Sequence, residues 1–292
     1  MNNSFRADNY NHIMPEVRIV RRVASLQPSI TVTLRDLGLM RYLAACTKYC
    51  IELCPELKNS GVAVIEDSWS AQTEQILAAR PDLVMASVPY RMESLAQIMK
   101  AGVPCLCLAP KTLADVLLDV LHIARIMGAE HRGLPLVTRM EREIERVRRI
   151  TSELPQRRVY CEEWGKPLIH SQPWVAELVR AAGGEFVGHP GKQVTEDEVA
   201  AADPEVIIAA WCGAGDRVPL EKLAARRGWC ETRAVRERRV YCIRDEFLNT
   251  PASTLLQGLH ALSAAIHPEL FGEAAGLKRL ASAANVQHAR EA

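Results

Sequence analysis

The sequence predicts an α/β protein of two lobes that are joined by one long α-helix. Three observations support this fold class: a unit that occurs once in each half, short apolar segments that alternate with helical patterns, and a charged amphipathic stretch between the halves. The chain has 292 residues, which is enough for two domains of ordinary size. Its 48% hydrophobic and 24% charged residues are typical of a globular protein.

The repeated unit consists of a short helix, a proline break and a buried strand. Residues 73–86 and 196–209 each begin with an acidic helix start, continue with an apolar helix face and reach an X-Pro-acidic break. Proline lacks a backbone N–H and disfavours helical geometry in the residue before it, so each helix should end there. The apolar run after the break is typical of a strand buried on both faces. We therefore expect the two halves to share one design.

Other apolar segments follow the same pattern. Because helical patterns alternate with them, we expect largely parallel sheets and two Rossmann-like lobes. The expected strands are 19–26, 62–65, 83–86 and 105–108 in the first half, and 158–162, 206–210 and 239–243 in the second. The expected organisation is an N-terminal lobe at 17–128, a linking helix at 129–154, a C-terminal lobe at 155–271 and a tail at 272–292.

The segment between the halves predicts two helices. The first covers 112–127 and ends at Gly128, and the second covers about 130–153 and ends before Pro155. At 1.5 Å per residue, about 20 residues span roughly 30 Å, so the second helix is expected to be a rigid spacer. We interpret its many arginines as a solvated face. Its apolar residues, at spacings of 3, 4, 3 and 7, form one helical stripe: Val137, Met140, Ile144, Val147 and Leu154.

Composition and motifs exclude several classes of function. The net formal charge of +1 gives no general attraction to nucleic acid or to an anionic membrane. No run of about 18 apolar residues is present, so no membrane-spanning helix is expected. The sequence also lacks the dinucleotide, Walker A, zinc-protease and nucleophile-elbow motifs, so nothing in it requires an enzyme.

The N-terminus and the cysteines bear on the compartment. Residues 1–16 are polar and lack the apolar segment of a secretory signal, so the chain as written is expected in the cytosol. A periplasmic location would require an export signal at the true N-terminus. Nine cysteines, an odd number, fit a reducing compartment better than a disulfide scaffold.

Three of the cysteines are spaced by four residues. Cys46, Cys50 and Cys54 would share one face of a helix, where three thiolates could bind a soft metal. No neighbouring histidine or C-x-x-C pair completes a zinc site, so we interpret them as small buried hydrophobic residues and predict no metal site. Cys161 and Cys242 both follow Val-Tyr, and the sequence leaves a disulfide between them open.

Aromatic and polar residues gather where the loops of both halves should lie. Several follow an expected strand directly, and in open α/β sheets ligands bind outside the carboxyl ends of the strands. If both lobes turn these ends toward each other, a ligand cleft lies between them and suits a large, flat, partly apolar ligand. The candidate ligand-binding residues are Tyr49, Trp69, Tyr90, Glu163, Trp164, Trp211, Phe247 and Asn249.

Several motifs, in their order and spacing, resemble a known family. They are VASLQPSIT at 23–31, TKYC at 47–50, LAARPDLV at 77–84, AAGG at 181–184, DPEVI at 203–207 and RVY at 239–241. Over about residues 18–271 the chain resembles the helical-backbone (class III) substrate-binding proteins of ABC transporters. Its TKYC and EEW stretches are similar to those of the cobalamin-binding branch. The resemblance implies two lobes on one long helix, a ligand between them and little lobe closure.

The resemblance also implies roles for individual residues. In the vitamin B12 binder, a tyrosine that matches Tyr49 and the loop that matches 245–249 touch the ligand. The loop matching 87–90 holds a cleft tryptophan where this chain has Ser87, so Tyr90 or Trp69 would have to substitute. The family docks to its permease through one acidic residue at the tip of each lobe. The matching residues here are Glu93 and Asp197, with Glu196 and Glu198 alongside, although acidic residues at helix starts also simply stabilise the helix.

The leading functional hypothesis is a non-catalytic binding protein for a corrinoid of the vitamin B12 type. It would deliver cobalamin or a related corrinoid to an ABC importer or act as a soluble carrier, with His170 as a candidate cobalt ligand. One alternative is a binding protein for a ferric siderophore, haem or a metal ion. Others are a cytosolic corrinoid-handling enzyme that uses Glu163, Cys212 and Asp245, and a metal-thiol regulator built on the three spaced cysteines.

Overall fold

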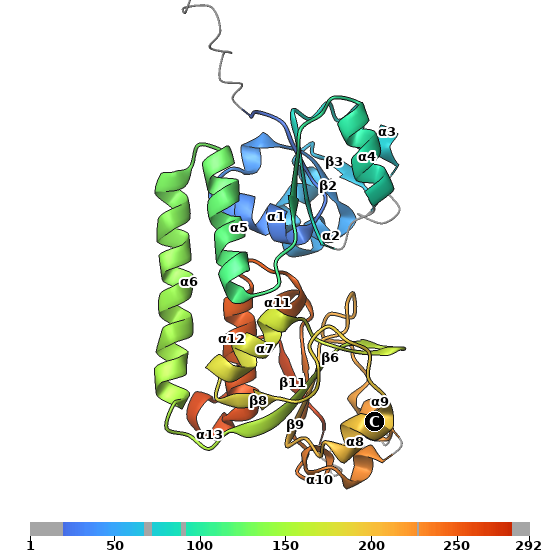
Figure 1. The fold of residues 1–292 in the computed structure, drawn as a ribbon, viewed down its shortest axis with the longest axis vertical. Coiled ribbons are helices and arrows are strands. Elements are labelled where there is room, and N and C mark those ends of the chain that lie inside the picture. The colour runs from blue at the N-terminus through green and yellow to red at the C-terminus, as the bar shows by residue number, and fades with distance from the viewer. Residues whose placement is uncertain (1–19, 67–71, 89–91, 227, 282–292) are drawn as a thin grey trace, which may run out of the picture.

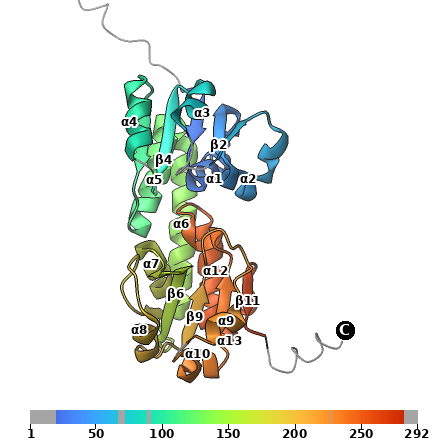
Figure 2. The same cartoon turned by 90° about the vertical axis from the view of Figure 1, so that its right-hand side faces the viewer.

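The protein consists of two sheets, one above the other, with a long helix alongside both (Figure 1). The computed structural model describes residues 20–66, 72–88, 92–226 and 228–281. Figure 2 shows that helices lie on both sides of each sheet. No helix in these ranges is long and apolar enough to cross a membrane.

The first lobe is built on a parallel sheet of five strands. Their order is β3-β2-β1-β4-β5, and every pair in it is parallel. Its strands are β1 (Val23–Ser25), β2 (Leu43–Thr47), β3 (Ala63–Ile65), β4 (Leu83–Ser87) and β5 (Cys105–Leu108). Its helices are α1 (Pro28–Asp36), α2 (Lys48–Leu53), α3 (Thr73–Ala78) and α4 (Met92–Lys100), with the 3₁₀ turns Met40–Tyr42 and Pro55–Asn59.

The second lobe has a sheet of six strands in the order β11-β10-β9-β6-β7, and β8 also pairs with β6. The pairs among β6, β8, β9 and β10 are parallel, whereas β7 and β11 are antiparallel additions. The strands are β6 (Arg157–Gly165), β7 (Leu168–His170), β8 (Gly184–Phe186), β9 (Val206–Ala209), β10 (Val240–Ile243) and β11 (Leu277–Arg279). The helices are α7 (Pro173–Ala181), α8 (Glu196–Ala201), α9 (Leu220–Ala224), α10 (Arg233–Arg236), α11 (Glu246–Asn249), α12 (Leu255–Ile266) and α13 (Pro268–Phe271), with a 3₁₀ turn at Trp229–Glu231.

Two helices join the lobes, and both were expected from the sequence. In α5 (Leu113–Ile126), Thr112 and Asp115 form a reciprocal capping box at the start. The long helix α6 (Glu130–Thr151) ends two residues before the expected position and continues through Pro135. A Cβ at Gly133 would lie 2.5 Å from the Cβ of Ala124, so only glycine lets α5 and α6 pack this closely.

The repeated unit takes the same conformation in both lobes. The short helices α3 and α8 are each followed by a non-glycine residue with positive φ, Arg80 at 48° and Asp203 at 39°. A proline, an acidic residue and a parallel strand come next. Asp82 then accepts hydrogen bonds from the backbone of Arg21 and Arg22, and Glu205 accepts one from the N–H of Arg158. The repeat therefore predicts both the elements and their local geometry.

Some expected elements were wrong. The segment 43–47 was not expected as a strand, yet β2 lies beside the centre of the first sheet. Cys46 therefore belongs to a strand and does not share a helix face with Cys50, which lies in α2, or Cys54, which follows it. Strand β11 falls within the expected tail, but it pairs with β10 and so belongs to the second sheet.

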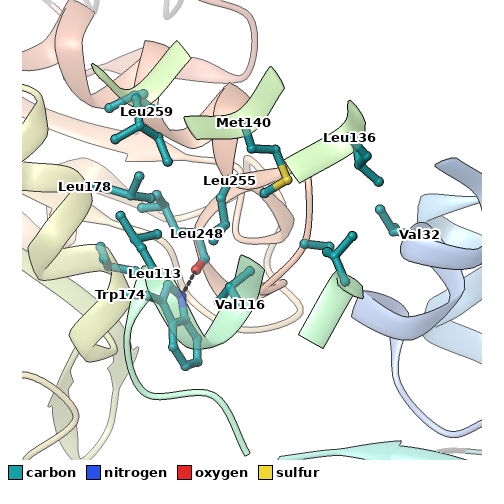
Figure 3. Packing of buried hydrophobic residues seen from close by; sticks show 14 of the residues in the cluster. Val32, Leu113, Val116, Leu136, Met140, Trp174, Leu178, Leu248, Leu255 and Leu259 are labelled. Atoms are coloured by element: carbon teal, nitrogen blue, oxygen red, sulfur yellow. Dashed lines mark hydrogen bonds between the residues drawn. The ribbon is translucent and has the colours of Figure 1, made fainter. Parts of the chain in front are cut away.

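A single hydrophobic cluster extends through both lobes and α6. Its buried members come from α1 of the first lobe, from the connecting helices α5 and α6, and from α7 and α12 of the second lobe (Figure 3). Those labelled in Figure 3 are Val32, Leu113, Val116, Leu136, Met140, Trp174, Leu178, Leu248, Leu255 and Leu259. Because packed cores are not continuously deformable, this shared core limits movement of one lobe against the other.

The carboxyl ends of the strands in each sheet lie toward the other lobe. Leu113, which follows β5, donates its N–H to the carboxylate of Glu177 in α7 at 2.9 Å. Ser253, which follows β10, donates its hydroxyl to the carboxylate of Asp36 at the end of α1. The described segments that carry candidate ligand-binding residues are therefore at the junction of the lobes, where such folds place ligands.

Candidate functional site

Trp211 follows β9 at the centre of the candidate site in the second lobe. Its indole N–H donates to Oε1 of Glu162 at 2.7 Å, and its ring is half-buried. A Cβ at Gly165 would lie 2.6 Å from Cζ2 of this ring, so the indole rests directly on the backbone at the end of β6. Two neighbouring strands thus fix the position of Trp211.

Glu163 and Asn249 belong to the same group of contacts. The amide of Gln172 donates to Oε2 of Glu163 at 2.8 Å, and the Cys212 thiol lies 3.7 Å from its other oxygen. Asn249 donates to the carbonyl of Ala210 at 2.8 Å and lies 3.3 Å from the sulfur of Cys212. Burial raises the pKa of Glu163, although its hydrogen bonds oppose this.

Asp245 fixes the glycine loop that follows Cys212. Its two carboxylate oxygens accept the N–H groups of Gly213 and Gly215 at 2.8 and 2.7 Å. Burial raises the pKa of Asp245 despite these bonds. Trp174 holds the following loop in place, because its indole N–H donates to the carbonyl of Leu248 at 2.8 Å (Figure 3).

Tyr49 and Trp164 are the most exposed of the predicted aromatic residues that the structure describes. Tyr49 lies in α2, directly after β2, and is 38% exposed, with the Lys48 ammonium 5.2 Å from its ring centre. Trp164 is 43% exposed, and its N–H donates to the carbonyl of Lys166 in the β6–β7 hairpin. One aromatic surface therefore comes from each lobe. The predicted residues Trp69 and Tyr90 lie outside the described residues.

Two predicted ligand contacts lie elsewhere. Phe247 is half-buried, and its ring lies 2.5 Å from where a Cβ at Gly276 would be, beside β11. Its side chain therefore packs against the edge of the sheet instead of joining Trp211. His170 as a cobalt ligand is wrong, because the ring is buried against Tyr160 and Phe186 and bonds the carbonyl of Lys192. Burial lowers its pKa.

Cysteines and acidic residues do not form a metal site in the described parts of the chain. No three histidine, cysteine, aspartate or glutamate side chains there are arranged to hold an ion. Cys161 and Cys242 are both free, and strand β9 separates their strands. A disulfide between them is therefore not formed.

The comparison with known families decides the classification. The profile of the periplasmic binding protein family matches residues 23–247. The chain belongs to this family. The resemblance seen in the sequence is thereby confirmed at the level of the family and of the two-lobed fold.

Individual relatives of this periplasmic binding protein differ in what their names say they bind. An uncharacterized ABC transporter substrate-binding lipoprotein, YvrC of Bacillus subtilis, is 24% identical over 269 residues, which cover 87% of this chain and 82% of YvrC. A vitamin B12-binding protein of Pectobacterium carotovorum is 27% identical over 211 residues, covering 68% of this chain and 73% of that protein. A periplasmic heme-binding protein from Pseudomonas aeruginosa has a similar structure, with a TM-score of 0.79 and 20% identity over 90% of this chain and 99% of that one.

The predicted docking residues differ in their surroundings. Glu93 is exposed in the first turn of α4, and Asp197 is exposed in the first turn of α8. Glu198 accepts both the N–H and the hydroxyl of Thr195, so it caps α8. In the repeated unit, Asp197 aligns with Glu74 in the first turn of α3, whereas Glu93 lies outside the repeat.

A separate hollow lies between α6 and α12. It has a volume of about 850 Å³, and none of the predicted ligand-binding residues that the structure describes lines it. Its lining is Leu134, Pro135, Thr138, Arg139, Arg142, Glu143, Arg146, Leu256 and His260.

The sequence did not indicate two polar residues of the site, Gln172 and Arg226. Gln172 precedes α7 and reaches Glu163, and Arg226 follows α9 and reaches Glu162 at 2.6 Å. The contact of Arg226 with Glu162 joins segments 64 positions apart in the chain, whereas Gln172 lies nine positions after Glu163, beyond the β6–β7 hairpin. The only available signal was the pair of acidic residues in β6, Glu162 and Glu163, because a buried carboxylate requires a polar partner.

Proposed function

We propose that this protein binds a corrinoid of the vitamin B12 type between its lobes and delivers it to an ABC permease. As a periplasmic binding protein it is a substrate-binding protein of ABC transporters, and members of this family bind solutes without transforming them. The nature of the solute, its position and the docking residues are the parts that we propose. The relative whose name states vitamin B12 supports the choice of solute.

The observation that carries the proposal is the aromatic surface at the junction of the lobes. Trp164 and Trp211 lie at the carboxyl ends of adjacent strands, and Tyr49 projects from the other lobe. Indole and phenol rings offer large, rigid contact areas, as a broad macrocycle requires. Burial raises the pKa of both Glu163 and Asp245 at this edge.

Titration of the purified protein with cyanocobalamin and cobinamide, followed by calorimetry and visible absorbance, tests the proposal. We expect one-to-one binding with a dissociation constant below about 1 μM, equivalent to roughly 8 kcal/mol. Absence of binding by both corrinoids at high micromolar concentrations would overturn the proposal.

Haem is the second candidate solute. It is favoured by the exposed phenol of Tyr49, since tyrosine can ligate haem iron, and by the similar heme-binding structure. Hemin titrated in parallel separates the two solutes. If haem is the solute, Tyr49→Phe should abolish the absorbance change that accompanies binding. If a corrinoid is the solute, the same substitution keeps the ring and should change its affinity only slightly.

For docking, the structure supports the first turns of α3 and α8 better than that of α4. These two helices are the equivalent parts of the repeated unit, and each carries an acidic residue in its first turn. We therefore propose Asp197 and Glu74 as the matched carboxylates that meet permease arginines, with Glu196 beside Asp197. Glu93 remains the competing prediction for the first lobe.

A further inference from the structure

Glu162 is a fully buried carboxylate directly behind Trp211. Its side chain is 0% exposed and accepts hydrogen bonds from three side chains. The Trp211 indole donates to Oε1 at 2.7 Å, while the Tyr160 hydroxyl and the Arg226 guanidinium donate to Oε2 at 2.9 and 2.6 Å. Among the described residues, Oε1 therefore accepts only from Trp211, and Oε2 accepts from Tyr160 and Arg226.

Arg226 balances the charge of Glu162 and is itself held in place. Its guanidinium lies 5.7 Å from the ring centre of Trp211 and 4.9 Å from that of Trp229. Its Nε also lies 3.9 Å from a carboxylate oxygen of Glu196, at the start of α8. The Arg226 guanidinium therefore lies between the Trp211 and Trp229 indoles and close to the start of α8. These contacts leave the Glu162 carboxylate little freedom to move.

Stability alone does not explain a buried ion pair at this place. Removing two charges from water offsets most of their attraction, and apolar residues of similar size often stabilise as well or better. What the pair provides and apolar residues cannot is a directed acceptor for the indole N–H of Trp211.

We infer that Glu162 is a positioning residue, which orients the Trp211 indole for contact with the ligand, and that Arg226 holds Glu162 in the geometry this requires. The inference rests on the proposed function, because Trp211 is taken as part of the ligand surface. Glu162 itself is buried and does not touch the ligand.

Glu162→Gln tests this role because glutamine has only one acceptor oxygen. Arg226 cannot lose its proton, so that oxygen must turn toward the guanidinium. The glutamine NH₂ group then faces the Trp211 N–H, and because both are donors no hydrogen bond forms between them. The indole thus loses the hydrogen bond that fixes its orientation. Glu205→Gln is the matched control: Glu205 precedes β9, pairs with Arg233 at 3.2 Å and accepts the N–H of Arg158, but at the opposite end of the same sheet.

The first readout needs no ligand. The chain has five tryptophans, and the indole N–H signal of Trp211 in a ¹H–¹⁵N spectrum is identified by its loss in Trp211→Phe. We expect this signal to move and to exchange faster with solvent in Glu162→Gln, and to stay unchanged in Glu205→Gln. An unchanged Trp211 signal in Glu162→Gln would overturn the inference even if the protein bound no corrinoid.

The second readout is corrinoid affinity in a double-mutant cycle. Loss of a hydrogen bond to a charged group predicts about tenfold weaker cyanocobalamin binding in Glu162→Gln. Combining it with Trp211→Phe should cause no further loss, because phenylalanine has no N–H to position. Wild-type affinity in Glu162→Gln, or losses that add in the double variant, would contradict the inference. Absence of binding by the wild-type protein would instead contradict the proposed function.

Discussion

At the scale of single residues, Glu143 shows how one carboxylate can join two helices. It lies in α6 and accepts two hydrogen bonds from Arg146, at 2.7 and 2.9 Å, on its own helix. Nε2 of His260, in α12 of the second lobe, lies 2.6 Å from the same carboxylate. The hydrogen bonds from Arg146 are the main reason that the pKa of Glu143 falls to about 2, below its usual value.

Glu143→Gln should therefore lower the free energy of unfolding at pH 7 by about 1 kcal/mol, a figure reduced for the exposure of its partners. A carboxylate whose pKa is lowered by folding stabilises the protein above the unfolded pKa. The difference from wild type should thus persist down to about pH 4.5 and vanish as the pH falls toward 2. Urea unfolding at several pH values measures it.

Glu145→Gln is the control, because Glu145 pairs with Arg149 within α6 alone. It should cost less, about 0.3–0.5 kcal/mol. Equal losses in the two variants would show that the contact with α12 contributes nothing. A Glu143→Gln effect that does not shrink in acid would show that the stabilisation does not come from the charge of Glu143.

The positions of site residues could be predicted where they follow from chain order, but not where they depend on distant partners. Glu163 and Trp164 lie at the carboxyl end of β6, Trp211 follows β9, and Asn249 lies in α11 after β10, so their arrival at one edge could be predicted. Arg226 could not, because its contact with Glu162 crosses 64 positions in the chain. Phe247 also follows a strand, but its ring lies against Gly276. No local sequence pattern predicts this contact.

At the scale of elements, the first turns of α3 and α8 carry the docking proposal. Glu74→Gln and Asp197→Asn should each slow association with the permease reconstituted in lipid, and the effect should fade at high salt because exposed charges act mainly on encounter. Surface plasmon resonance at low and high ionic strength measures this. Glu93→Gln should behave like wild type; if it slows association and Glu74→Gln does not, the equivalence of α3 and α8 has no bearing on docking.

Elements were predictable where apolar pattern and breaks agree. The long helix and the two helix–proline–strand units satisfy both conditions, and the structure contains each of these elements close to its expected bounds. Strand β2, with the sequence Leu-Ala-Ala-Cys-Thr, carries few β-branched residues, and the four-residue spacing of its cysteine with later ones imitates a helix. Strand β11, Leu-Lys-Arg, is a short polar edge strand. Its three residues show no strand pattern, and only its pairing with β10 in the structure identifies it as a strand.

At the scale of the whole molecule, the shared core explains why this fold suits a preformed site. The hydrophobic cluster runs from α1 through α6 to α12 without interruption, so the two carboxyl edges are held at a nearly fixed separation (Figure 3). A rigid site loses little entropy when a rigid macrocycle binds. The repeat could predict two lobes, but the side chains that meet between them depend on packing that only the folded chain defines.

The central claim is that the ligand lies against the aromatic edge of the second lobe. The most direct test is the cyanocobalamin affinity of Trp164→Ala/Trp211→Ala, measured by calorimetry beside wild type and the control Leu134→Ala, an exposed residue of α6 remote from that edge. We predict a loss of at least about a hundredfold in the double variant, as expected for two buried aromatic contacts, and wild-type affinity in the control. Binding by the folded double variant as tight as that of wild type would contradict the claim.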